Sequence, residues 1–146
     1  MLPQPGVDSR TCNDRPMTEF GCARCSGEDA LTALAFCTTR LNKTHRLVER
    51  SHFSISLRRC PECGQSFAAI FTEFVDWAGG EDAQYFDFVP LTTAEVSSLA
   101  KQGAGVDLAE LGALGSVRRR LSSSWPTGGE KEIAWRTDSL SVREGH

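Results

Sequence analysis

The sequence contains no apolar run that approaches the roughly 18 residues of a membrane-spanning helix. Residues 1–8 also lack the basic cap and the apolar core of a secretory signal peptide. We therefore expect no membrane partner and a cytoplasmic location, where thiols stay reduced. This expectation disfavours a disulfide framework for the 6 cysteines and makes metal binding their better use.

Lysine and arginine are absent between Cys60 and Ala100, whereas acidic residues recur throughout that stretch. The preceding segment, residues 40–59, has the opposite character, because it contains six lysine and arginine residues and a single acidic residue, Glu49. Wherever an acidic block faces solvent, it repels a phosphate backbone. The charge distribution therefore disfavours nucleic acid as a partner and favours another protein.

Four of the cysteines form two pairs with the same two-residue spacing, Cys22 with Cys25 and Cys60 with Cys63. Four thiolates in two such pairs suit a tetrahedral Zn²⁺ ion, because each pair can occupy one edge of the tetrahedron from a tight turn. A site closed by four thiolates leaves no position for water or substrate. We therefore predict a structural zinc site that contributes folding free energy, in a protein that is not an enzyme.

Through Cys22-Ala23-Arg24-Cys25 and Cys60-Pro61-Glu62-Cys63-Gly64, the chain resembles the zinc-ribbon class of proteins. The resemblance covers residues 20 to about 90, and it implies a Cys₄ zinc site and an antiparallel sheet of three or so strands. The segment between the pairs is longer than the roughly 15–20 residues of compact ribbons. That insertion must fold as its own lobe, or the two pairs belong to different sites.

Alternating and aromatic-rich stretches predict the main strands. Residues 53–58 alternate apolar and polar side chains, the period of a half-buried strand, and lead directly into Cys60. Residues 67–77 are apolar on both faces, which is typical of a central strand. Residues 84–89 supply a third strand, which Pro90 either ends or places at a sheet edge.

Helices are predicted mainly in the C-terminal half. Thr92 and Glu95 have capping-box spacing and open a helix that Gly103 closes, and Asp107 opens a second helix to about Leu121. The predicted fold class is therefore α+β, a zinc-ribbon-like antiparallel sheet of three or so strands with two C-terminal helices packed on it. Weaker patterns indicate a helix over 29–42, short strands over 45–50 and 132–136, and a loop over 122–129.

The length of 146 residues fits one domain. Residues 1–20 are rich in Pro, Asp, Ser and Thr and show no period, so we predict a mobile N-terminal arm. Residues 21–136 then form a single zinc-ribbon-containing α+β domain, and residues 137–146 form a flexible tail.

Two further functions stay open on the sequence. Cys60 and Cys63 could act as a redox dithiol, although thioredoxin-like chemistry needs a helix after the motif and here a strand is predicted. A nucleic-acid-binding zinc ribbon could use the basic 40–59 segment and Arg118–Arg120, which lie near Trp125 and Trp135. A solvated helix end explains those arginines equally well.

The remaining thiols and imidazoles have simpler interpretations. Cys12 is an incidental free thiol or an alternative metal ligand, and Cys37 is a small buried residue. His45 and His52 are close in sequence to Cys37, but nothing supplies the orienting third group of a Cys–His nucleophile. We therefore expect no catalysis from them.

The acidic, aromatic-rich stretch 73–86 has two interpretations. Exposed aromatic residues among acids suit a basic protein partner. Alternatively, Trp77, Tyr85 and Phe86 are cross-strand pairs of the core. The acids of this region are interpreted as a solvated face rather than a catalytic acid–base pair; they are Glu73, Asp76, Glu81, Asp82 and Asp87.

Overall fold

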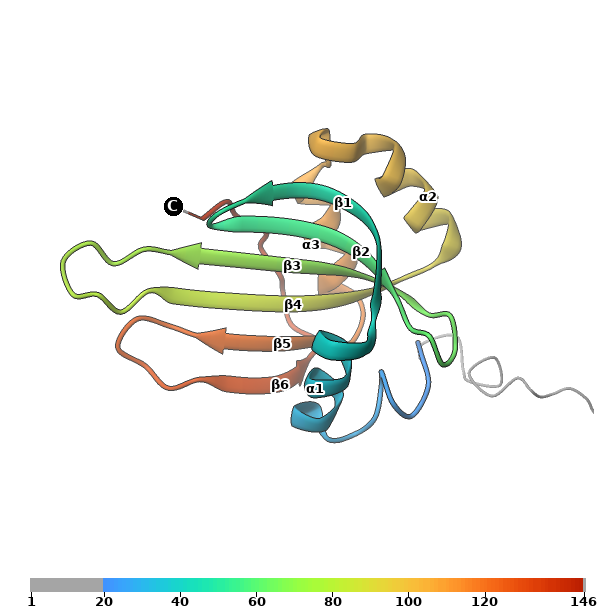
Figure 1. The fold of residues 1–146 in the computed structure, drawn as a ribbon, viewed down its shortest axis with the longest axis horizontal. Coiled ribbons are helices and arrows are strands. Elements are labelled where there is room, and N and C mark those ends of the chain that lie inside the picture. The colour runs from blue at the N-terminus through green and yellow to red at the C-terminus, as the bar shows by residue number, and fades with distance from the viewer. Residues whose placement is uncertain (1–19, 146) are drawn as a thin grey trace, which may run out of the picture.

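The computed structural model describes residues 20–145, so Cys12 and nearly all of the predicted N-terminal arm lie outside the described residues. The described chain forms an antiparallel sheet in the order β1-β2-β3-β4-β5-β6, with helices on both of its faces (Figure 1). Its elements are α1 (Ala30–Arg40), β1 (Asn42–Arg50), β2 (Phe53–Arg59), β3 (Ser66–Phe74), β4 (Ala83–Leu91), α2 (Thr93–Gln102), η3 (Gly103–Gly105), α3 (Leu108–Ser116), β5 (Arg120–Trp125) and β6 (Glu132–Arg136).

The α+β class is confirmed, but the prediction of three or so strands and two helices is wrong in detail: within residues 20–145 the sheet has six strands, and α1 adds an N-terminal helix. Ser122–Ser124, predicted as a loop, lies inside β5, where Ser122 is opposite Asp87 and Ser123 is opposite Phe86. These serines belong to the strand because their backbones pair with β4, and residue composition, which here is typical of turns, carries no information on such pairing.

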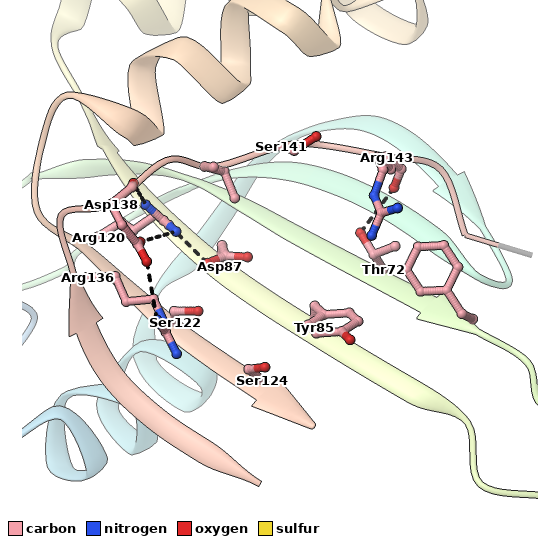
Figure 2. Close-up of a pocket in the computed structure, with 12 residues that line it drawn as sticks. Thr72, Tyr85, Asp87, Arg120, Ser122, Ser124, Arg136, Asp138, Ser141 and Arg143 are labelled. Carbon is pink, nitrogen blue, oxygen red and sulfur yellow. Dashed lines mark hydrogen bonds and ion pairs between the residues drawn. The ribbon is translucent and has the colours of Figure 1, made fainter. Parts of the chain in front are cut away.

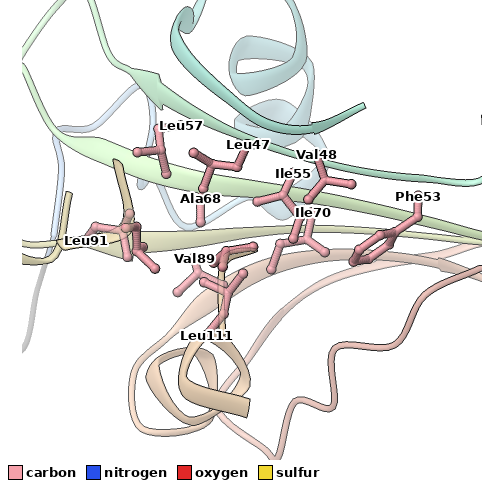
Figure 3. Close-up of a cluster of buried hydrophobic side chains, with 12 residues drawn as sticks. Leu47, Val48, Phe53, Ile55, Leu57, Ala68, Ile70, Val89, Leu91 and Leu111 are labelled. Atoms are coloured by element: carbon pink, nitrogen blue, oxygen red, sulfur yellow. The ribbon is translucent and has the colours of Figure 1, made fainter. Parts of the chain in front are cut away.

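The alternation of side chains along β3 divides the interior into two cores. Ala68 and Ile70 point into the first core, which lies between the sheet and the α2–α3 layer (Figure 3). Phe67 and Ala69 point into the second core, which lies on the opposite face under α1 and the cysteines. The predicted central strand is confirmed, because β3 is paired on both sides and apolar on both faces.

The segment between the two cysteine pairs does not fold as a separate lobe. It forms α1, which lies on the second core, and then the hairpin of β1 and β2, which joins the sheet next to β3. The hairpin brings Cys60 back to the first cysteine pair (Figure 1). The long insertion is therefore compatible with a single shared site.

The helix boundaries follow the predicted caps at their N-termini. The Thr92 hydroxyl accepts from Glu95 N, and the Glu95 carboxylate accepts from Thr92 N, which completes the capping box of α2. The Asp107 carboxylate caps α3 by accepting from the N–H groups of Ala109 and Glu110. However, α3 ends at Ser116, because the chain turns into β5 where a helix to about Leu121 was predicted.

Pro90 neither ends β4 nor makes it an edge strand, since β4 runs to Leu91 between β3 and β5. The pairing of β4 with β5 stops at Phe88 opposite Leu121, so the strand is locally unpaired on that side at Pro90. A missing N–H is tolerated where no neighbouring strand accepts it.

Residues 137–145 contain neither helix nor strand. Leu140 and Val142 pack against the first core, and the Leu140 N–H donates to the Ser116 hydroxyl at 2.7 Å. The segment predicted as a flexible tail thus contacts the face of the sheet that α2 and α3 leave uncovered (Figure 1).

Candidate metal centre

The four predicted ligands converge at one end of the sheet. The Sγ atoms of Cys22 and Cys25 are 3.8 Å apart, those of Cys22 and Cys60 are 3.9 Å apart, and those of Cys25 and Cys63 are 3.8 Å apart. All four atoms lie within 4.8 Å of one another. Both C-x2-C pairs therefore belong to one cluster.

These distances fit a metal ion and exclude a disulfide. Sulfur atoms on a tetrahedron about 2.3 Å from a central Zn²⁺ are separated by about 3.8 Å. A disulfide would require about 2.05 Å between the two sulfurs, and all the described cysteines are free. The cluster is compatible with a Cys₄ metal site.

The first cysteine turn, residues 21–26, is shaped by a close backbone approach. Gly21 has a φ of +90°, and a Cβ there would lie 2.6 Å from the Cys25 Sγ. The Ser26 N–H donates to the Cys22 carbonyl at 2.8 Å, and the Cys22 N–H donates to the Cys25 Sγ at 3.3 Å. Only glycine allows the chain to pass so near the sulfur with a positive φ.

The second cysteine turn, residues 60–65, closes the hairpin of β2 and β3. The Gly64 N–H donates to the Cys60 carbonyl at 2.8 Å, which repeats the bond from Ser26 to Cys22, and the Cys60 N–H donates to the Gln65 carbonyl at 2.8 Å. Gly64 has a φ of +83°, which returns the chain to β3. The predicted strand–turn–strand context of the second pair is confirmed.

The thiols of the cluster have unequal proton affinities. For Cys22, burial opposes ionisation, but hydrogen bonds from the backbone N–H groups of Cys25 and Arg24 lower the thiol pKa to about 7. Burial raises the pKa of Cys60 to about 11, and the neighbouring thiolates add to that rise. Four thiolates this close repel one another, so the arrangement favours a divalent cation that displaces the protons.

Cys37 is a neighbour of the cluster and not a member of it. Its side chain is buried in the second core, and its Sγ donates to the Cys25 carbonyl at 3.7 Å. Burial raises the pKa of this thiol to about 12, with the charge of Cys60 contributing. Cys37 is the small buried residue that the sequence predicts.

The histidines do not join Cys37 to form a nucleophile. The His45 Nδ1 lies 3.1 Å from the Thr44 hydroxyl, and the His52 Nδ1 lies 3.0 Å from the Glu73 carboxylate. Glu73 also accepts from the Gln84 amide at 2.9 Å. These histidines and Glu73 therefore make ordinary pairs with their neighbours. The prediction of a solvated acid is wrong for Asp87, which is buried and pairs with Arg120 at 3.3 Å.

The structure assigns Arg118–Arg120 to internal contacts. Arg118 forms two hydrogen bonds with the Glu95 carboxylate, at 2.7 and 3.0 Å. Arg120 is 4% exposed and pairs with Asp87 at 3.3 Å. The three arginines therefore do not form the helix-end patch that was one interpretation of the sequence.

Sequence reasoning missed the residues that hold the first cysteine turn on the sheet. The Arg119 guanidinium donates to the Ser26 hydroxyl at 3.2 Å and the Gly27 carbonyl at 3.2 Å. It also lies 3.7 Å from the ring centroid of Trp135, whose Nε1–H donates to the same Gly27 carbonyl at 2.7 Å. The sequence signals were the short predicted strand that contains Trp135 and the nearness of Arg118–Arg120 to Trp135 in the chain, which was interpreted as a possible nucleic-acid surface and not as support for the cysteines.

The sequence left two interpretations open for the aromatic residues of the acidic stretch 73–86, exposed binding residues or core pairs, and the structure shows some of each. Phe86 and Tyr85 form edge-to-face ring pairs with Phe71 and Phe74, respectively, as cross-strand packing requires. Trp77, by contrast, is 84% exposed, beyond the end of β3. The core interpretation therefore holds for Phe86, which packs against the second core, and is wrong for Trp77. Tyr85 is half-buried.

Comparisons with protein-family models, with curated proteins and with solved structures find no match for this chain. Among the described residues, no helix has the length and apolar character needed to cross a membrane.

Proposed function

We propose that this chain is a non-enzymatic, protein-binding module whose fold is stabilised by one zinc ion held by Cys22, Cys25, Cys60 and Cys63. The observation that carries the metal assignment is the spacing of the four Sγ atoms, all within 4.8 Å. Tetrahedral sets of four thiolates are typical of zinc or iron–sulfur centres. Four protein ligands leave no open position, so the metal's role is structural.

A surface at the tips of two hairpins supports the binding role. The β3–β4 and β5–β6 hairpins extend in the same direction, away from the metal centre (Figure 1). Their tips are joined, because the Thr127 hydroxyl donates to the Glu81 carbonyl at 2.8 Å and the Gly128 N–H donates to the Glu81 carboxylate at 3.0 Å. Between the tips lies a cavity of about 370 Å³, here called the hairpin cleft.

The chemistry of the hairpin cleft suits a cationic side chain. Glu81 and Asp82 contribute carboxylates to its lining, and Trp125, 47% exposed, contributes an aromatic wall. The Lys131 Nζ already lies 5.6 Å from the ring centroid of Trp125, which illustrates how a cation can bind there. We therefore propose that an arginine or lysine from a basic partner segment inserts into the hairpin cleft.

Titration of the ¹⁵N-labelled chain with N-acetylarginine amide tests this proposal, with N-acetylcitrulline amide as the neutral isostere. We expect shifts at Glu81, Asp82 and the Trp125 indole with the arginine probe, weakened by the double substitution Glu81→Gln, Asp82→Asn. Glu110→Gln on α3 is the matched control. Equal shifts from the citrulline probe, or shifts unaffected by the double substitution, would overturn the proposed cleft.

One observation favours nucleic acid as a second candidate partner. Strand register places Lys43, Arg46 and Arg58 on the same sheet face as Phe71 and Phe86. The acids Glu49 and Glu73 share this face, whereas Asp87 points to the opposite face. The Arg58 guanidinium lies 5.7 Å from the ring centroid of Phe86. Basic and aromatic side chains together can bind a single strand.

Binding of oligo-dT at low and moderate salt separates the two candidates. Affinity that falls steeply with salt and is weakened by Arg58→Gln would support the nucleic-acid candidate. We expect weak or no binding, because acidic residues dominate the chain between Cys60 and Ala100.

A further inference from the structure

A second cavity, here called the polar cavity, lies on the same sheet face as the first core, beyond the cover of α2 and α3 (Figure 2). Its volume is about 320 Å³, at the lower end of the range for small-molecule sites. Tyr85, Ser122 and Ser124 line it from β4 and β5, and residues 138–143 pass along its other side (Figure 2). The cavity is therefore an open groove between the sheet and the C-terminal segment.

One end of the polar cavity is fixed by a buried ionic network. The Arg120 guanidinium donates to the Asp87 carboxylate at 3.3 Å and the Gly115 carbonyl at 3.1 Å. It also donates to the Asp138 carbonyl at 2.6 Å and the Asp138 carboxylate at 3.0 Å. These bonds use the donor capacity of Arg120, so it shapes the cavity and does not itself contact a ligand.

The other lining groups retain capacity to bind. Among residues 20–145, the hydroxyls of Tyr85, Ser124 and Ser141 have no hydrogen-bond partner, and the Arg143 guanidinium has no ion pair. Arg143 lies 5.1 Å from the ring centroid of Phe74, which holds the charge at the cavity. Ser141 and Arg143 are exposed, and Tyr85 and Ser124 are half-buried, so a polar guest could replace the water that these groups contact.

The charges and rings of the lining define the guest. Three arginines, at 120, 136 and 143, line the cavity. Arg120 pairs with Asp87 and Asp138, and Arg136 pairs with Asp138 and Glu132, so among the described residues Arg143 is the lining cation without a carboxylate partner. Phe74 and Tyr85 pack edge to face, with centroids 6.1 Å apart, and supply an aromatic wall. We propose that the polar cavity binds a small organic monoanion with a flat, ring-sized body, its carboxylate at Arg143 and its ring against Tyr85.

Benzoate is the probe that tests this inference on the full, metal-loaded chain, with neutral benzamide and cationic benzamidine as controls. Saturation-transfer NMR should show saturable benzoate binding with a dissociation constant of about 1–10 mM, as expected for so small a ligand. Benzamide should bind at least about five-fold more weakly, because it lacks the charge that pairs with Arg143.

Arg143→Gln should weaken benzoate binding by at least about five-fold, because it removes the unpaired cation and keeps the main chain that contacts Thr72. Tyr85→Phe and Ser124→Ala each remove one lining hydroxyl, and they test benzoate binding in its place if Arg143→Gln folds poorly. Lys101→Gln, which removes one exposed positive charge from the last turn of α2, is the matched control and should leave binding unchanged. No saturable binding at about 20 mM, stronger binding of benzamidine, or indifference to all three cavity substitutions would overturn the proposal.

Discussion

The two faces of the sheet are covered by different means. On the first core, α2 and α3 bring fully buried aliphatic residues such as Leu99 and Leu111 onto the strands. On the second core, the single short helix α1 contributes Leu34 and Phe36, and the cysteines complete the cover. The comparison teaches that hydrophobic burial alone covers one face, whereas on the other face it is joined by a cluster of four thiols that is compatible with a metal ion.

Loss of a metal ligand should have the largest effect. We expect Cys60→Ser or Cys22→Ser to abolish zinc binding and to lower the free energy of unfolding by more than about 3 kcal/mol, since metal binding is coupled to folding. Zinc content by elemental analysis and chemical denaturation measure the two effects. Cys12→Ser is the control and should change little; full zinc retention by Cys22→Ser would contradict a shared site.

Loss of the buried arginine should come next. Arg120→Leu leaves the Asp87 carboxylate buried without its cation, and we expect a cost of about 3–5 kcal/mol. Burial already raises the pKa of Asp87, and Arg120 opposes that rise. The variant should therefore regain stability at acid pH, where Asp87 is neutral; a denaturation series across pH that shows a constant loss would refute this explanation.

Truncation in the first core should break that face and leave the metal in place. Leu111 is fully buried, so Leu111→Ala is expected to cost about 2–5 kcal/mol while zinc content stays unchanged. Leu31→Ala on α1 is the matched control, because Leu31 is 62% exposed and should matter by less than about 0.5 kcal/mol. Loss of zinc from the folded Leu111 variant would show that the two faces are not independent.

The smallest effect concerns the capping carboxylate of α2. Hydrogen bonding to Arg118 holds the pKa of Glu95 below its ordinary value of 4.5, so the stabilisation is present at neutral pH and is lost as pH falls through the lowered pKa. Glu95→Gln should cost about 1 kcal/mol at pH 7, through the cap and the ion pair. The melting temperatures of Glu95→Gln and the unsubstituted protein should converge as the pH falls below 4.5. An equal difference in melting temperature at pH 7 and at acid pH would argue against a stabilising role for the Glu95 carboxylate.

The local signals in the sequence predicted the elements that depend on nearby residues. The alternation over 53–58, the caps at Thr92 and Asp107, and the spacing of each cysteine pair are evident within a few positions. A register between distant strands leaves no such local signal. The β5 strand was missed for that reason, because its serines acquire their partners only from β4.

The support of the site was likewise hidden from the sequence. Arg119 and Trp135 lie far along the chain from the first cysteine turn, and their contacts with Gly27 exist only once β5 and β6 have joined the sheet. Three adjacent arginines suggested a basic patch, but each guanidinium has a different internal partner. The sequence shows that a side chain is charged, but it does not show whether that side chain points to solvent or to an internal partner.

Metal content per chain, with a count of reactive thiols before and after chelation, tests the central claim most directly. On protein purified without added metal, the account predicts one zinc per chain and about four additional thiols exposed on chelation, from the Cys22, Cys25, Cys60 and Cys63 cluster. Protein without metal, in which Cys60 and Cys63 cycle between dithiol and disulfide, would contradict the account and favour a redox role.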